Sequence, residues 1–428
     1  MDVLVRAGKR LLVVVGVALL LLGVTVVGVW AAERVEITVA HPYGKIFRPI
    51  HQEIIKEFNK KFPNIRVILE TPYPDYEELT QRTLTGISQN NAPVLSYQGV
   101  NQIRQYVESG HAYDLSGFVA ADPRWKEERG YYPTMMALGN FNGKQYAIPF
   151  AISTPIVYYN ADLLRRAGAE VGPDNPPQTW DELIAAAHKV KALGPQYTGM
   201  FFDYLITGNW MWQAILTCEG GSMMDAKETR VTFADEPGIR AAKMLRRFVD
   251  EGIMQDWTRL QGEQAFIAGR VGFYVSSTSW LKGVQDKAGF DLRTCLFPPG
   301  SAGLRRLPNG GNGGMIITKD PAKAKAAYEY AMFASGPIGT AIQVKGSGYM
   351  PMHEKGTEAL QDFYAANPNF KTSLQQIPYI YRWYSFPGAN TLKIIDVIKD
   401  RLQAIVGKKA NPEEAIKSAA DQVRDLLK

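Results

Sequence analysis

Apolar positions after residue 33 alternate between two spacings. Val35 to His41 (VEITVAH) has the alternation typical of a strand. Lys45 to Phe62 has its apolar residues at helical spacing, and Pro63 ends that segment. The same order recurs twice, with strands predicted over Ile65 to Glu70 and Ala92 to Tyr97 and helices over Tyr76 to Ser88 and Gln102 to Ser109. This alternation predicts an α/β fold with open, mostly parallel sheets and helices on both faces.

The rest of the chain continues the pattern with more helix. Phe141 to Asn160 reads as extended, with a turn at Asn142–Gly143 and breaks at Pro149 and Pro155. Helices are predicted over 179–193, 235–250, 321–334, 391–406 and 411–427, and strands over 271–275 and 315–318. Ligands of open α/β sheets bind beyond the carboxyl ends of the strands. Those ends are expected near residues 41–43, 71–76 and 98–101.

The first 32 residues have a different composition from the rest. Basic residues at positions 6–10 precede an uncharged, mostly apolar run from Leu11 to Trp30, which is the order of a secretory signal. The run is also long enough to span a bilayer. Residues 1–32 are therefore predicted to be a signal peptide or an uncleaved membrane anchor. In both cases the body from Glu33 onward is expected to be periplasmic or extracellular.

Composition narrows the class of protein. The chain has 428 residues, 46% hydrophobic and 21% charged, which is an ordinary globular balance and excludes general disorder. The 48 basic and 42 acidic residues leave a net charge of +6, too small a surplus to indicate nucleic-acid binding. Cys218 and Cys295 are too few for an all-cysteine zinc site, and whether they pair stays open.

Motifs of reacting groups are missing from the sequence. It has no GxSxG, HExxH or GxxxxGK[ST], and its five histidines are scattered. The glycines at 310–314 resemble a phosphate cradle, but a strand is predicted after them, and a flexible crossover explains them equally well. Trp210 and Trp212 would lie on opposite sides of a helix, which would place at least one of them in the core. We expect no enzyme, no cofactor and no metal.

Several segments carry a family resemblance. They are FNGKQYAIPFAISTPIVYYNADLLRRAG (Phe141–Gly168), PPQTWDELIAAA from Pro176, GEQAFIAGRVGFYVSSTSW near Ser276, the pair Gly310–Gly311, and GSGYMPM (Gly346–Met352). Together they resemble the carbohydrate-type extracellular solute-binding proteins of ABC importers (family 1), and within them the glycerol-3-phosphate-binding group. The resemblance covers residues 33–428.

The resemblance implies a type II periplasmic-binding-protein fold. Each lobe would be an open sheet flanked by helices, with a hinge between the lobes. The implied boundaries are 33–150 and 305–335 for lobe 1, and 151–300 and 336–428 for lobe 2. The implied function is capture of a sugar, polyol, glycerol phosphate or glycerophosphodiester by hinge closure. The implied partner is a membrane-embedded ABC permease, served by a monomer.

Position by position, the resemblance implies ligand contacts from six residues: Tyr76, Ser153, Ser276, Gly311, Tyr349 and, as an aromatic wall, Trp210. Two positions depart from the family. Its ligand-binding glutamate falls near Gln98 to Asn101, so Asn101 is the candidate there. Its phosphate-binding arginine falls just before Gly388, where the nearest arginine is Arg382. If Arg382 reaches the cleft, a phosphate ligand is favoured; otherwise a neutral saccharide or polyol fits better.

Two other classes of function stay open from the sequence alone. The aromatic-rich composition admits a secreted hydrolase acting on glycosides or phosphodiesters, although no catalytic constellation can be assembled. The long apolar leader admits a membrane-tethered ligand sensor.

Overall fold

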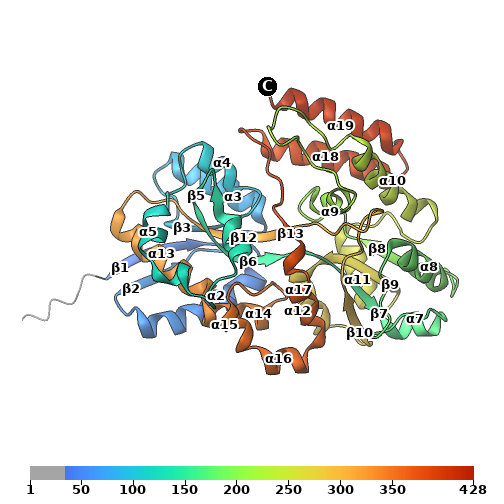
Figure 1. Ribbon diagram of the computed structural model, residues 1–428, viewed down its shortest axis with the longest axis horizontal. Helices are drawn as coiled ribbons and strands as arrows, with labels where there is room; N and C mark the ends of the chain where they lie inside the picture. The colour runs from blue at the N-terminus through green and yellow to red at the C-terminus, as the bar shows by residue number, and fades with distance from the viewer. Residues whose placement is uncertain (1–33) are drawn as a thin grey trace, which may run out of the picture.

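The computed structural model describes residues 34–428, so the predicted signal or anchor at residues 1–32 lies outside the described residues. Two separate open sheets form the centres of two lobes, which lie side by side in Figure 1. The predicted two-lobe α/β fold is confirmed. No helix in the part of the chain that the structure describes is long and apolar enough to cross a membrane.

The first lobe is built on a five-stranded sheet with the order β2-β1-β3-β12-β6. Strands β1, β2 and β3 are parallel, whereas β12 runs antiparallel to both of its neighbours. Helices α2 and α13 pack on this sheet, and the inward side chains Ile37 and Val39 are fully buried. The bounds are β1 (Val35–Ala40), β2 (Ile65–Leu69), β3 (Leu95–Gly99), β6 (Ala147–Ser153), β12 (Gly310–Ile316), α2 (Gly44–Lys61) and α13 (Pro321–Ser335).

The second lobe is built on a four-stranded sheet with the order β10-β7-β9-β8. Only β8 and β9 are parallel, so the prediction of mostly parallel sheets was wrong for this lobe. The physical reason is the path of the chain. It leaves the first sheet through β6 and enters the second directly as β7, with only Thr154 between them. The strands are β7 (Pro155–Asn160), β8 (Thr198–Phe202), β9 (Val271–Ser277) and β10 (Leu292–Cys295).

The remaining helices cover the two sheets and extend the second lobe. Helices α10, α18 and α19 pack on one another and form its outer layer (Figure 1). The bounds are α3 (Tyr76–Ser88), α4 (Ile103–Glu108), α5 (Ser116–Ala121), α6 (Pro133–Met136), α7 (Ala161–Arg166), α8 (Trp180–Lys191), α9 (Trp210–Cys218), α10 (Glu236–Asp250), α11 (Arg259–Ile267), α12 (Leu281–Gln285), α14 (Pro337–Gly346), α15 (Glu354–Glu358), α16 (Gln361–Ala366), α17 (Lys371–Gln375), α18 (Thr391–Val406) and α19 (Pro412–Leu426).

Short strands connect the lobes. Strands β11 (Leu307–Pro308) and β13 (Ile380–Tyr381) form a parallel pair, and β13 lies between the two lobes in Figure 1. Strand β11 leads through Asn309 into β12 of the first sheet. A second small pair, β4 (Asn140–Phe141) and β5 (Lys144–Gln145), forms the hairpin whose turn the sequence predicted.

The glycine cluster at 310–314 lies inside strand β12 and is fully buried. The prediction of a flexible crossover there was wrong. Bare backbone is needed because side chains from both lobes press on this strand. A Cβ atom on Gly310 would lie 2.7 Å from Ser153 Oγ and 2.8 Å from Trp210 Cζ2. Glycine therefore lets Trp210 pack directly against the sheet.

Both cysteines are free and buried. Burial raises the pKa of Cys218 to about 11 and the pKa of Cys295 to about 12. Both thiols therefore stay protonated and unreactive near neutral pH.

Two imidazoles lie together in the core of the first lobe. The ring centroids of His41 and His51 are 5.3 Å apart, and the Nδ1 of His51 shares a hydrogen bond of 2.9 Å with the Tyr330 hydroxyl. Neither Nε2 atom has a hydrogen-bond partner. Burial lowers the pKa of both side chains, strongly for His51, so both are neutral in the folded protein near neutral pH.

This pair predicts acid sensitivity. The unfolded chain takes up protons on these histidines below pH 6.5, whereas the folded chain does not, so the free energy of unfolding falls as the pH falls. We expect a loss of about 2–4 kcal/mol between pH 7.5 and pH 5, measured by urea unfolding, because each histidine that stays neutral contributes up to about 2 kcal/mol. Carboxylates with lowered pKa values lose their contribution only below about pH 4. A free energy of unfolding that is flat between pH 7.5 and pH 5 would contradict the prediction.

Candidate ligand-binding site

A cavity lies between the two lobes. Residues from both lobes and from the connecting segments line it: Tyr43, Ile46, Tyr76, Ser153, Gly310 and Gly311 from the first lobe, Ile206, Thr207, Trp210, Arg259, Ser277, Ser279 and Trp280 from the second, and Tyr349 and Trp383 from later segments. Because each lobe supplies part of the wall, moving the lobes apart would open the cavity.

Local sequence places three of these side chains at the start of helices. The Asp75 carboxylate accepts a hydrogen bond of 2.8 Å from the Glu78 N–H and begins α3, so that Tyr76 is its first residue. A capping box between Thr258 and Gln261 begins α11 in the same way. Helix α9 begins at Trp210. The three helices therefore present an aromatic ring, a guanidinium and an indole at the cavity.

Six of the fifteen described residues that line the cavity are aromatic. Tyr43 and Tyr76 meet edge to face with centroids 5.3 Å apart, and Tyr349 stacks on the core residue Phe47 at 5.4 Å. The Trp210 indole N–H donates to the carbonyl of Pro308 at 3.1 Å, which fixes the ring. Burial raises the pKa of Tyr349 to about 12, so its phenol keeps its proton. Rigid rings with neutral hydroxyls suit the C–H faces and hydroxyls of a polyol.

Arg259 is the one charged side chain among the described residues that line the cavity. Its guanidinium lies over the Trp280 ring, 4.4 Å from the centroid, and its Nε is 3.3 Å from the Asp203 carboxylate. Asp203 is fully buried and accepts hydrogen bonds from the hydroxyls of Ser276 and Tyr274. Burial raises the pKa of Asp203. Burial opposes the charge of Arg259, but Asp203 and neighbouring groups raise its pKa above the ordinary value.

The structure brings together five of the eight predicted ligand-binding residues: Tyr76, Ser153, Trp210, Gly311 and Tyr349 line the same cavity. Ser276 does not line it, because its hydroxyl donates to Asp203 at 2.8 Å on the other face of β9. Its neighbour Ser277 does line the cavity, as alternation along a strand requires. Trp212, two positions after Trp210, packs in the core against Phe233, as predicted for a helix.

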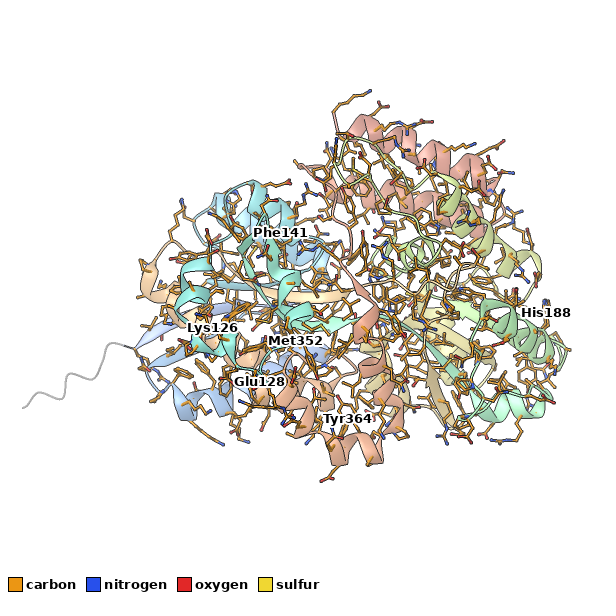
Figure 2. All side chains as sticks on the ribbon, in the orientation of Figure 1. Lys126, Glu128, Phe141, His188, Met352 and Tyr364 are labelled. Atoms are coloured by element: carbon orange, nitrogen blue, oxygen red, sulfur yellow. The ribbon has the colours of Figure 1, made fainter. Side chains whose placement is uncertain are left out.

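Asn101 and Arg382 also lie outside the cavity lining. The backbone carbonyl of Asn101 accepts a hydrogen bond from Ser385. The Arg382 guanidinium donates to the carbonyls of Ala137 and Asn140, at 2.7 and 2.6 Å. It also lies over the ring of Phe141, which Figure 2 labels on the first lobe. Arg382 is therefore already engaged with the first lobe and leaves the cavity without the arginine expected from that segment.

Four prominent lining residues were not among the predicted ligand contacts: Tyr43, Arg259, Trp280 and Trp383. Tyr43 could have been predicted, because it lies just beyond the predicted end of the first strand. Trp383 belongs to an aromatic run that is plain in the sequence. Arg259 was missed because no helix was predicted between residues 250 and 271. The T-x-x-Q spacing from Thr258 to Gln261 was the available signal.

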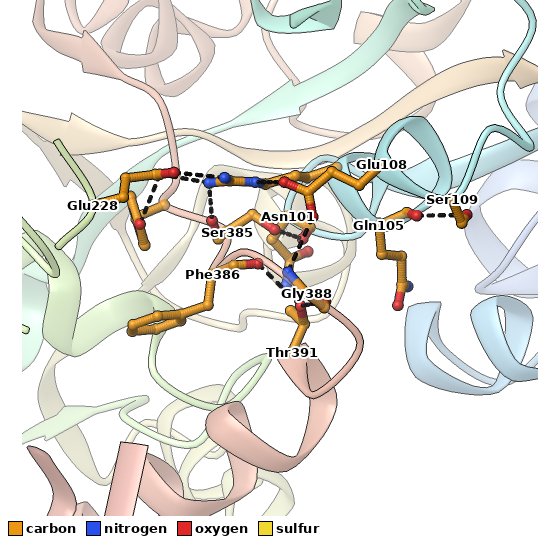
Figure 3. A network of polar contacts seen from close by, with 11 residues as sticks. Asn101, Gln105, Glu108, Ser109, Glu228, Ser385, Phe386, Gly388 and Thr391 are labelled. Carbon is orange, nitrogen blue, oxygen red and sulfur yellow. Dashed lines mark hydrogen bonds and ion pairs between the residues drawn. The ribbon is translucent and has the colours of Figure 1, made fainter. Parts of the chain in front are cut away.

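A polar network joins the lobes at the edge of the cleft (Figure 3). Arg104, on α4 of the first lobe, donates to both carboxylate oxygens of Glu228 at 2.5 and 2.6 Å. Glu228 lies between α9 and α10 of the second lobe. Arg104 also donates to the Ser385 carbonyl at 3.0 Å, and Glu108 on the same helix accepts from the backbone N–H of Gly388. These bonds hold the lobes together in the closed arrangement.

A cavity enclosed by two hinged α/β lobes and lined by binding groups defines a two-lobed binding protein. The chain belongs to the bacterial extracellular solute-binding protein family, whose sequence profile matches residues 53–372. This membership confirms the prediction of a solute-binding protein that is not an enzyme. The family is extracellular, in agreement with the compartment expected from the sequence.

The chain is similar along nearly its whole length to known binding proteins. A binding protein of Brucella abortus is 26% identical over 412 residues, covering 93% of this chain and 94% of that protein. The sn-glycerol-3-phosphate-binding periplasmic protein UgpB of Escherichia coli is 21% identical, with 88% of each covered. These distant relatives confirm the predicted resemblance to the glycerol-3-phosphate-binding group.

Solved structures share the fold. The structure of UgpB from Mycobacterium tuberculosis in complex with glycerophosphocholine superimposes with a TM-score of 0.81 at 23% identity, covering 92% of this chain and 98% of that one. An ABC substrate-binding protein of Listeria monocytogenes in complex with cycloalternan gives a TM-score of 0.80 at 21% identity, covering 92% and 99%.

Proposed function

We propose that this chain is the extracytoplasmic substrate-binding component of an ABC importer. It captures a small polyol-type solute, such as a sugar, a glycerol phosphate or a glycerophosphodiester, by closing its two lobes. The observation that carries this proposal is the cavity, whose aromatic and hydroxyl wall comes from both lobes. Similar proteins that bind sn-glycerol 3-phosphate, glycerophosphocholine and cycloalternan support the same solute range.

We further propose roles for the lining residues. Trp210 and Tyr349 pack on the carbon skeleton of the solute, and Ser153 and Tyr76 hydrogen bond to its hydroxyls. Gly311 lets the solute approach the backbone closely. The closed monomer delivers the solute to a membrane-embedded permease. Residues 1–32 export the chain, and the intact mass of the exported protein distinguishes a cleaved signal from an anchor.

The lobe boundaries belong to the same proposal. Lobe 1 comprises 33–150 and 305–335, and lobe 2 comprises 151–300 and 336–428, with two extensions of lobe 1. Strand β6 belongs to the first sheet as far as Ser153, so residues 151–153 are assigned to lobe 1. Helix α14 begins at Pro337, yet it packs on α2 and α13 of the first lobe. We therefore assign residues 337–346 to lobe 1.

Closure on a solute is the test of this proposal. We expect small-angle scattering to give a smaller radius of gyration for the protein with bound solute than without, because the closed arrangement requires lobe-to-lobe contact. Tryptophan fluorescence should change in parallel, since Trp210, Trp280 and Trp383 line the cavity. A panel of sugars, glycerol phosphates and glycerophosphodiesters that produces neither change would contradict the proposal.

A further inference from the structure

We infer that Arg259 is the residue that recognises charge in this site, and that the solute is a small polyol or sugar carrying one anionic group. This inference rests on the proposed function and names the substrate class of the same cavity. It departs from the position at which the sequence resemblance placed the arginine, because it assigns the role to a different element on the second lobe, the first turn of α11.

The guanidinium of Arg259 is oriented from two sides. The face of Trp280 covers one side at 4.4 Å, and Asp203 lies 3.3 Å from Nε. The Nε–H makes no hydrogen bond despite this distance, and the structure gives no hydrogen bond to either terminal nitrogen. The side chain is 30% exposed. The Arg259 guanidinium is thus oriented by Trp280 on its face and by Asp203 near Nε, while its terminal N–H groups are free. This arrangement is suited to bidentate recognition of a phosphate or carboxylate.

The charged residues around the cavity also favour a solute with an anionic group. No carboxylate occurs among the described residues that line it. Asp203 lies behind Arg259, and two hydroxyl donors, Ser276 and Tyr274, already hold its carboxylate. It is fully buried, so it does not reach the solute. Arg259 is therefore the one charged group that the described lining presents to a solute, and its free terminal N–H groups suit an anionic acceptor better than a cationic group.

The position of Arg259 also orients the solute. Arg259, Tyr43 and Thr207 line both the cavity and the adjoining space at the mouth of the cleft. That outer space is lined by Asp75 and Glu77 and by Asp396, which forms an ion pair with Lys399 on the same helix, α18. The anionic group is thus placed at the outer end of the cavity, with the carbon skeleton toward Trp210.

Matched pairs of solutes test the inference on the exported protein. We propose calorimetric titration with glycerol 3-phosphate against glycerol, glucose 6-phosphate against glucose, and galacturonate against galactose. We expect the anionic member of at least one pair to bind at least about 10-fold more tightly. Arg259→Gln should abolish that preference while changing the affinity for the neutral member by less than about threefold. Arg259→Lys should retain part of it, because the charge remains and the bidentate fork is lost.

Arg382→Gln is the matched control, because it removes an arginine that is bonded to the first lobe. The preference of this variant for the anionic over the neutral solute should equal that of the wild type. The melting temperature of each variant shows whether it is still folded. The double variant Arg259→Gln with Asp203→Asn removes both members of the ion pair, so no buried carboxylate is left without its partner. Neutral solutes that bind as well as anionic ones and close the lobes would overturn this inference while supporting the proposed function. A preference lost in Arg382→Gln would overturn it as well. A panel in which nothing binds would count against both.

Discussion

Replacement of Gly311 by alanine is expected to destabilise the protein by about 3 kcal/mol or more. Gly311 has φ of +97°, a region that L-residues with a side chain avoid at a cost of about 1–2 kcal/mol. A Cβ atom would also lie 1.7 Å from the carbonyl oxygen of Ala151 on the neighbouring strand. Relief requires moving β6 away from β12, and such overpacking costs about 1–3 kcal/mol more. Urea unfolding measures the loss as a lower midpoint.

Gly143→Ala separates the two causes. Gly143 also has a positive φ, +78°, but a Cβ atom there would meet nothing within 4 Å. We expect this variant to lose only the backbone contribution, about 1 kcal/mol. Equal losses in the two variants would show that β6 and β12 yield easily at Gly311. The close approach would then not be a fixed feature of the cavity wall.

Local signals fixed the helices well. The spacing of apolar residues between a cap and a breaker predicts Tyr76–Ser88 and Thr391–Val406 with the bounds that the structure shows. Strand direction was harder to predict, because period-2 alternation is the same in parallel and antiparallel strands. The return of β12 between β3 and β6 is a long-range pairing that no local window reports.

The glycine strand illustrates a second limit. Residues 310–314 carry one side chain in five, Asn312, so no hydrophobic pattern is available to predict a strand. The candidate site shows the same contrast between what the sequence assigns and what only the tertiary fold decides. Residues that the family resemblance assigned position by position, such as Ser153 and Tyr76, do line the cavity. The cation could not, because it depends on which arginine the tertiary fold brings to the cavity. Arg382 is held by the first lobe and Arg259 by Trp280.

The interlobe ion pair leads to the second large expected effect. Arg104→Ala should weaken solute binding about 10-fold, because Arg104 and Glu228 lie on different lobes and can pair only when the lobes meet. Arg104 is 19% exposed and donates to Glu228 through two N–H groups, a geometry stronger than that of an isolated surface pair. Hydrogen bonding to Glu228 raises the pKa of Arg104, and Arg104 in turn lowers the pKa of Glu228. Both groups are therefore charged near neutral pH.

The expected tenfold loss corresponds to about 1.4 kcal/mol, within the range for a partly buried bidentate pair. It should appear as faster release of the solute, because the closed form is destabilised and the open form is not. Calorimetry and stopped-flow fluorescence on Arg104→Ala, Glu228→Gln and the double variant isolate the pair through the coupling energy. Arg82→Ala is the control, since its ion pair with Glu78 lies exposed on a single helix of the first lobe. Equal effects of Arg104→Ala and Arg82→Ala, or additive losses in the double variant, would show that the pair does not hold the closed form. A coupled loss with an unchanged free energy of unfolding would show that the pair acts on lobe closure and not on the fold of either lobe.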